Sequence, residues 1–165
     1  MLEVIEPGLL STVQDTGRPG WAHLGVPHAG ACDPLSLAVA NLLLGNEPGA
    51  AALEMTIAGA TLAIRRTGLV ALAGADLGGV VHETGQRLQP GAVHLLRAGM
   101  TIAFPGIASD LPGCRAYLAL PGGIDVREVL GSRSTSLIGS FGGIGGRPLA
   151  PGDRLRPTRT ADAGL

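Results

Sequence analysis

The sequence of 165 residues contains no lysine, and its twelve basic residues are all arginines. Without a lysine side chain the protein cannot carry biotin on lysine, form a Schiff base or supply the lysine of a phosphate-binding P-loop. We therefore expect no cofactor to be bound covalently by this chain. Any such chemistry must come from another chain or domain.

Aromatic residues make up only 2 % of the chain, and the formal net charge is −1. A nucleic-acid-binding surface needs a basic stripe with interleaved aromatics, so we expect no nucleic-acid partner. The longest apolar stretch, 35–44, is too short to span a bilayer, and the N-terminus lacks a signal-peptide pattern, so we expect no membrane association. The two cysteines, Cys32 and Cys114, are far apart and unpatterned, which predicts reduced thiols in a cytoplasmic protein.

Short β-prone runs recur along the chain, separated by turn residues that include many of its 27 glycines and 12 prolines. This spacing predicts a mainly β fold, a barrel or a sandwich, rather than a parallel α/β sheet. The length suits one domain, which we place at residues 1–157, with 158–165 as a tail or linker. The predicted strands are 2–5, 9–14, 52–57, 61–65, 69–73, 79–82, 92–97, 100–104 and 115–120.

One principal helix is predicted over residues 34–44. Asp33 is a good N-cap, Pro34 suits the first helical position, and Gly45 can supply the left-handed residue that follows a helix. Aliphatic residues recur at helical spacing and predict a single apolar face. That face comprises Leu35, Ala38, Val39, Leu42 and Leu43. A single helical turn is also expected at 126–130.

The segment 13–33, which joins a predicted strand to the helix, is dense in polar and turn residues. Long structured loops of this kind are often binding loops. Asp15 and Arg18 lie across a turn at Gly17 and could together hold the N–H and C=O of an amide or urea, so they are our candidate catalytic pair. Trp21 could shield them from water. The competing interpretation is that Asp15 caps the turn and Arg18 forms a surface ion pair.

His28, Asp33 and Ser36, near the end of this segment, are candidates for substrate binding. An imidazole titrates near neutral pH, although the simpler interpretation of His28 is a structural or surface residue. Asp33 is first of all a helix cap. The histidines and cysteines do not have the spacing of a metal site, so no metal ligand is expected. We expect Cys32 to be a buried thiol.

A second polar segment combines the guanidinium of Arg133 with the hydroxyls of Ser134 and Thr135. These groups suit a carboxylate or a phosphate, which makes the segment a second candidate for substrate binding. The glycine-rich run 139–146 that follows matches neither the P-loop nor the dinucleotide-binding fingerprint. It is therefore weak evidence for a nucleotide site.

Three segments, taken together, resemble a known family. They are PGLLSTVQDTGR at 7–18, GVPHAGACDPLS at 25–36, and YLALPGGID at 117–125 with LGSRST at 130–135. Their order and combination resemble the carboxyltransferase-domain family, which includes allophanate hydrolase subunit 2, KipA-type proteins, the C subunit of 5-oxoprolinase and part of urea amidolyase. The sequence departs from that family in two ways. It covers only the first half of the usual protein, and Cys32 stands where a larger apolar residue is usual.

The resemblance implies a cyclophilin-like β-barrel and a site shared with a KipI-type partner, the allophanate hydrolase subunit 1. It implies a subunit of an ATP-dependent amide or lactam hydrolase of the 5-oxoprolinase or allophanate hydrolase subunit 2 type. ATP would act through the complex, with a LamB/YcsF-type subunit as a further partner in 5-oxoprolinase. The isolated chain is expected to be inactive. Whether it also forms a homo-oligomer stays open.

Two alternatives on the same scaffold remain open. One is a biotin-dependent carboxyltransferase module for a urea-type substrate, with biotin carried on another domain. The other is a non-catalytic regulatory module that binds a kinase-inhibitor partner.

Overall fold

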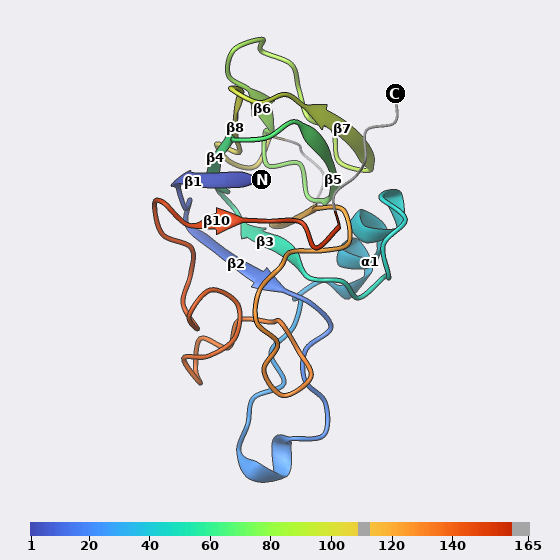
Figure 1. Ribbon diagram of the computed structural model, residues 1–165, viewed down its shortest axis with the longest axis vertical. Coiled ribbons are helices and arrows are strands. Elements are labelled where there is room, and N and C mark those ends of the chain that lie inside the picture. The colour runs from blue at the N-terminus through green and yellow to red at the C-terminus, as the bar shows by residue number, and fades with distance from the viewer. Residues whose placement is uncertain (109–112, 160–165) are drawn as a thin grey trace.

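The computed structural model describes residues 1–108 and 113–159 and shows two antiparallel sheets that pack against each other (Figure 1). One sheet has the order β10-β1-β4-β8-β6, and the other has the order β2-β3-β9-β5-β7. The first contains β1 (Leu2–Glu6), β4 (Thr61–Ile64), β6 (Val80–Val81), β8 (Thr101–Ala103) and β10 (Arg154–Leu155). The second contains β2 (Leu10–Gln14), β3 (Ala52–Thr56), β5 (Gly68–Gly74), β7 (Ala92–Leu96) and β9 (Arg115–Ala119). The predicted mainly β fold is confirmed.

Side chains alternate between the two faces of each strand, and this divides the interior into two layers. On β5, Val70 and Leu72 face the core between the two sheets, whereas Ala71 and Ala73 face the opposite side. Each of the nine predicted strands overlaps an observed one. Strand β10 escaped prediction because it has only two residues and is defined by its pairing with β1.

The helix α1 (Pro34–Leu43) covers the outer face of the second sheet (Figure 1), and it begins where predicted and ends one residue earlier. Asp33 accepts a hydrogen bond from the backbone N–H of Ser36, and Gly45 adopts a φ of 64°. The predicted apolar face is not the face that packs on the sheet. The helix buries Leu37, Ala40 and Asn41 against a layer of alanines, because these small side chains allow the helix to approach the sheet closely.

The larger aliphatic residues of α1 are consequently exposed, by 75 % at Leu35, 58 % at Leu42, and 38 % at both Val39 and Leu43. They form an exposed apolar face of the helix, distinct from the face that packs on the sheet. We call these four residues the outer face of α1. Exposed apolar patches on a protein surface often mark interaction sites.

One further expectation is wrong. Residues 126–130 form no helix: Leu130 and Gly131 have φ values of 54° and 79°, so the chain reverses there between Val129 and Ser132, which form a β-bridge. The predicted tail begins with two attached residues, because the backbone N–H groups of Thr158 and Arg159 donate to the carbonyls of Gly123 and Pro121. Residues 160–165 of that tail lie outside the described residues.

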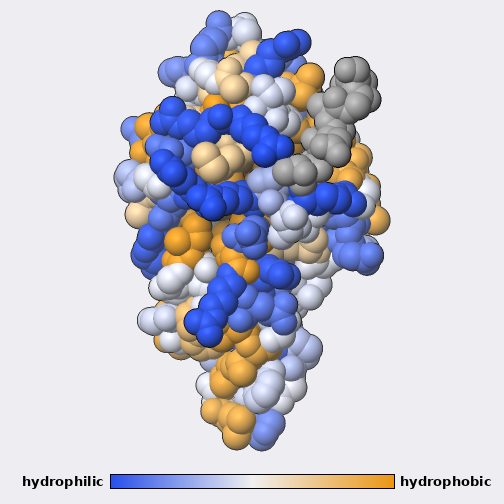
Figure 2. Space-filling model, in the orientation of Figure 1, coloured by the Kyte–Doolittle hydropathy of each residue, from blue (hydrophilic) through white to orange (hydrophobic). Residues whose placement is uncertain are grey.

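The segment before α1 projects from the sheets as an arm, residues 18–28 (Figure 1). At its base the backbone N–H of Arg18 donates to the carbonyl of His28 over 2.9 Å. The arm carries a short 3-10 helix, η1 (Ala22–Leu24), and Leu24 is 64 % exposed. Hydrophobic surface gathers at the end of this projection (Figure 2). Within the described part of the chain, no helix has the length and apolar character needed to cross a membrane.

Candidate functional site

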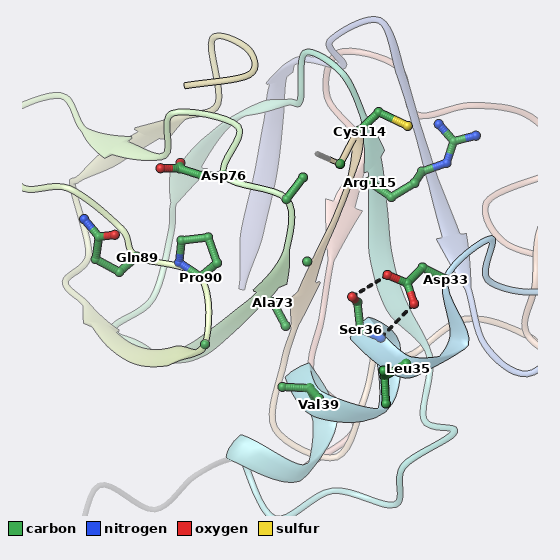
Figure 3. Close-up of a pocket in the computed structure, with 14 residues that line it drawn as sticks. Asp33, Leu35, Ser36, Val39, Ala73, Asp76, Gln89, Pro90, Cys114 and Arg115 are labelled. Atoms are coloured by element: carbon green, nitrogen blue, oxygen red, sulfur yellow. Dashed lines mark hydrogen bonds between the residues drawn. The ribbon is translucent and has the colours of Figure 1, made fainter. Parts of the chain in front are cut away.

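A cleft of about 790 Å³ lies between α1 and one end of the second sheet (Figure 3). Its walls come from the first turns of α1, the end of β5 with the residues after it, the loop before β7, and the start of β9. This volume falls within the range of small-molecule sites. We call it the helix-side cleft.

Asp33 and Ser36 form one wall of the helix-side cleft, where their side chains face each other (Figure 3). Ser36 donates twice to Asp33, from its backbone N–H to Oδ1 over 3.1 Å and from its hydroxyl to Oδ2 over 2.5 Å. The bond from the Ser36 hydroxyl is the largest cause that lowers the pKa of Asp33 below its ordinary value. Asp33 is therefore an ionised acceptor and a weak base, better suited to holding a substrate N–H than to removing its proton.

A buried hydrogen-bond chain behind this wall fixes Asp33 in place. The hydroxyl of Tyr117 donates to Glu54 Oε2 over 2.6 Å and accepts from the backbone N–H of Asp33 over 2.8 Å. Glu54 Oε2 also accepts from the backbone N–H of Cys32 over 2.8 Å. Burial, followed by the bond to Glu54, raises the pKa of Tyr117, so the phenol stays protonated.

Arg115 places a cation beside the hydrogen-bond chain of Tyr117 and Glu54. It lies two residues before Tyr117 on β9 and therefore on the same face, with Nε 3.7 Å from Glu54 Oε1. Its side chain is 26 % exposed. Asp76, drawn on the other side of the cleft in Figure 3, pairs with Arg87 over 2.9 Å. The cleft thus combines a guanidinium, two carboxylates and a hydroxyl.

Cys32 is exposed, which corrects the expectation of a buried thiol. Its backbone N–H donates to Glu54, whereas its side chain is exposed to solvent. Cys114 is also exposed and lines the helix-side cleft.

The predicted catalytic pair, Asp15 and Arg18, lies elsewhere, in a buried centre beneath the arm. Asp15 is 8 % exposed, and its Oδ1 accepts from the hydroxyls of Ser132, over 2.7 Å, and of Ser134. Its Oδ2 accepts from the backbone N–H of Arg133 over 2.6 Å. Oδ1 also accepts from the backbone N–H of Gly17 over 2.8 Å, which confirms the turn-capping interpretation.

Arg18 is 1 % exposed, so the surface ion pair expected of it is wrong. Its guanidinium donates to the carbonyl of Ser134 over 2.6 Å and lies 4.9 Å from the centre of the Phe141 ring. Burial lowers the pKa of Arg18. With these contacts, the geometry of Asp15 and Arg18 favours positioning of the 129–142 segment over direct contact with a substrate.

The remaining predicted residues lie in or near the buried centre and at the base of the arm. Thr135 is buried in the same centre and donates to the carbonyl of Val13 over 3.0 Å, whereas Arg133 turns its guanidinium to the carbonyl of Val126 over 3.1 Å. His28 is exposed at the base of the arm, with Nδ1 2.9 Å from its neighbour's carbonyl. Only Asp33 and Ser36 of the predicted site residues line the helix-side cleft.

Tyr117, Arg115 and Asp76 were not among the predicted site residues. The period of two along β9 places Arg115 and Tyr117 on one face, but the sequence does not show what that face meets. Among residues 1–108 and 113–159, no group of three or more histidine, cysteine, aspartate or glutamate side chains is arranged to hold a metal ion.

Comparison with known proteins gives a consistent result. The family model described as "Carboxyltransferase domain, subdomain A and B" matches residues 24–164. The chain is 41 % identical over 159 residues to the C subunit of 5-oxoprolinase from Escherichia coli, covering 94 % of this chain and 48 % of that protein. It is 38 % identical over 154 residues to urea amidolyase of Lachancea kluyveri, covering 93 % of this chain and 8 % of that enzyme. The chain therefore spans about half the length of the 5-oxoprolinase component that it matches, and a small part of urea amidolyase.

Solved structures agree on the fold. A crystal structure of TTHA0988 superposes with a TM-score of 0.86 at 38 % identity, covering 96 % of this chain and 57 % of that one. The urea amidolyase of K. lactis superposes with a TM-score of 0.87 at 35 % identity, covering 96 % of this chain and 9 % of that one.

Proposed function

The chain belongs to the carboxyltransferase domain family, subdomain A and B, and from this membership we propose that it is one component of a multi-subunit, ATP-dependent lactam hydrolase of the 5-oxoprolinase type. Relatives of this chain are components of enzymes, which supports a role in an enzyme. The substrate proposed is 5-oxoproline or a close analogue. Its ring amide would be opened in the assembled complex.

The observation that carries the proposal is the chemistry of the helix-side cleft. 5-Oxoproline presents a carboxylate, a ring N–H and a ring carbonyl, and its binding needs a cation, an acceptor and a donor. Arg115 supplies the cation, the ionised Asp33 supplies the acceptor, and the Ser36 hydroxyl lies beside it. Guanidinium groups match carboxylates well, because two of their N–H bonds can point at the two oxygens.

The activation of the lactam by ATP is assigned, in this proposal, to partner subunits of the KipI and LamB/YcsF types. The present chain has no lysine to hold a nucleotide phosphate. Its glycine-rich run folds back on the protein instead: a Cβ added at Gly142 would collide with the carbonyl of Ser134, and one at Gly143 with the hydroxyl of Thr135. Gly142 and Gly143 therefore serve close packing.

The similarity to urea amidolyase favours a second candidate, a biotin-dependent carboxyltransferase that acts on urea. The biotin would be carried on another domain. Urea has N–H and C=O groups but no carboxylate, so it would use Asp33 and leave Arg115 without a partner. Arg115 therefore distinguishes the two substrates.

The test is ATP-dependent hydrolysis of 5-oxoproline by the chain reconstituted with its partner subunits. We expect activity in the complete mixture, and Arg115→Gln should raise KM at least tenfold, about 1.4 kcal/mol in binding. Arg127→Gln is the matched control, since Arg127 is exposed and does not line the cleft. Thermal melts check that both variants fold. Biotin-dependent carboxylation of urea, insensitive to Arg115→Gln and without 5-oxoproline turnover, would establish the second candidate instead.

A further inference from the structure

A second cavity of about 370 Å³ opens at the opposite end of strands β5, β7 and β9 from the helix-side cleft. We call it the sheet-end cavity. Its floor is apolar and reaches the core between the two sheets. Five residues of that core line it, all at most 3 % exposed: Leu2 and Ile64 from one sheet, Val70 and Leu96 from the other, and Leu120 after β9.

Gly68, the first residue of β5, keeps this cavity open. It pairs directly with the buried Leu96 and precedes Val70 by two positions, so a side chain at Gly68 would point toward the core. A Cβ built there meets no atom within 4 Å, and the φ of Gly68 is not in the left-handed region. Neither backbone strain nor a close neighbour therefore requires glycine at this position.

The rim of the sheet-end cavity is cationic. Arg65, Arg66 and Arg156 line it, and no aspartate or glutamate is among the lining residues. Arg65 pairs with Glu3 over 3.2 Å, whereas Arg66 and Arg156 form no ion pair among the residues that the structure describes. On the face shown in Figure 2, hydrophilic bands flank a paler surface beside the N-terminal end of β1.

We propose that the sheet-end cavity binds a small amphipathic anion, with its apolar part between the sheets and its acid group at Arg66 and Arg156. A medium-chain carboxylate or the corresponding alkyl phosphate has this chemistry. The apolar floor excludes a wholly polar ligand such as 5-oxoproline, since burial there would leave its amide without hydrogen-bond partners. The proposal stands on different residues from those of the proposed function and does not depend on it.

The experiment is calorimetric titration of the purified chain with octanoate and octyl phosphate, and with octan-1-ol as the neutral probe. We expect saturable binding of an anionic probe and binding of octan-1-ol at least tenfold weaker. The anion that binds more tightly identifies the head group. Absence of saturable binding by both anions, or equal binding of octan-1-ol, would overturn the proposal.

Two variants locate the site. Gly68→Leu fills the cavity and should weaken binding of the anion at least tenfold, with a melting temperature no lower than that of the parent chain. Arg66→Gln with Arg156→Gln should also weaken it at least tenfold, while Arg127→Gln, at an exposed arginine away from the cavity, leaves it unchanged. If Gly68→Leu does not fold, the arginine variants decide. Binding that survives the double arginine substitution refutes the site.

Discussion

Tyr117 and Glu54 stand directly opposite each other on β9 and β3, and the phenol donates to the carboxylate over 2.6 Å. The same phenol oxygen accepts from the backbone N–H of Asp33, so the pair connects the interior of the sheet to the wall of the helix-side cleft. A buried hydrogen bond of this kind is costly to break, because the partner that remains is left unsatisfied. The position of Asp33 therefore depends on two residues that do not line the cleft.

Because Tyr117 is the chain's one tyrosine, its ionisation can be followed directly by the ultraviolet absorbance of tyrosinate. Its pKa in the folded protein is raised above the ordinary value of 10.0. Stability from this group is fully present below pH 10.0 and is lost as the pH rises further, because the unfolded chain then releases a proton that the folded chain retains. We expect no tyrosinate signal from the folded protein at pH 10.0. A half-maximal signal at that pH, while circular dichroism still shows native structure, would contradict the buried bond.

Asp33→Asn separates the cap of α1 from the charge in the cleft. Asparagine caps helices about as well as aspartate, so at neutral pH the free energy of unfolding should change by less than about 0.5 kcal/mol. Turnover in the reconstituted complex should fall at least tenfold, since the ionised acceptor is gone.

The depressed pKa of Asp33 stabilises the parent protein above pH 3.8, and this contribution is lost as the pH falls through the lower pKa of the folded state. Urea unfolding at neutral pH and at a pH below 3.8 should therefore show that acid lowers the free energy of unfolding less in the variant than in the parent protein.

Asp15→Asn tests the buried centre. The substitution replaces a carboxylate that accepts from two hydroxyls and two backbone N–H groups, and we expect a loss of about 2–5 kcal/mol in the free energy of unfolding. For a chain of this length that corresponds to a melting temperature lower by about 5–15 °C. Ser132→Ala, which removes one donor, should cost about 1 kcal/mol. An unchanged melting temperature together with lost turnover would instead show that Asp15 contacts the substrate.

The outer face of α1 is expected to pack against the partner subunit of the KipI type, beside the helix-side cleft that Leu35 and Val39 also line. Leu35→Gln with Leu42→Gln should weaken the complex at least tenfold, measured by calorimetric titration with that partner. The melting temperature of the isolated chain should stay the same, because both side chains are already exposed. Ile138→Gln is the control, because Ile138 is 90 % exposed and lies in a turn outside α1. Equal weakening by the control would show that the helix is not the interface.

Sequence reasoning succeeded where structure is determined locally. The strands and the ends of α1 follow from turn residues, a capping aspartate, a first-turn proline and a terminal glycine, all within a few positions. It did not show which face of α1 packs on the sheet, since the predicted apolar face includes Leu35 and Leu42, which are exposed. The facing sheet presents alanines, which makes close packing through Ala40 the better solution.

The candidate site shows the same division. Asp33 and Ser36 were candidates because they lie where the polar segment meets the helix, and the bond between them spans only three positions. Tyr117 meets Glu54 only through the register of β9 on β3, a pairing across 63 positions that no local pattern reveals. The burial of Asp15 likewise depends on residues more than 110 positions away.

The contact between Asp15 and Ser134 has a consequence for how the chain is made. The two residues are 119 positions apart, and closing a loop of that length costs about 4 kcal/mol in chain entropy. A ribosome must add more than 110 residues after Asp15 before the hydroxyls of Ser132 and Ser134 exist. Until then Asp15 has only its local bond from the backbone N–H of Gly17, and the Ser134 carbonyl that accepts from Arg18 does not yet exist. The base of the arm should therefore become ordered only after residues 132–134 have been synthesised, and it should stay accessible to chaperones and proteases until then.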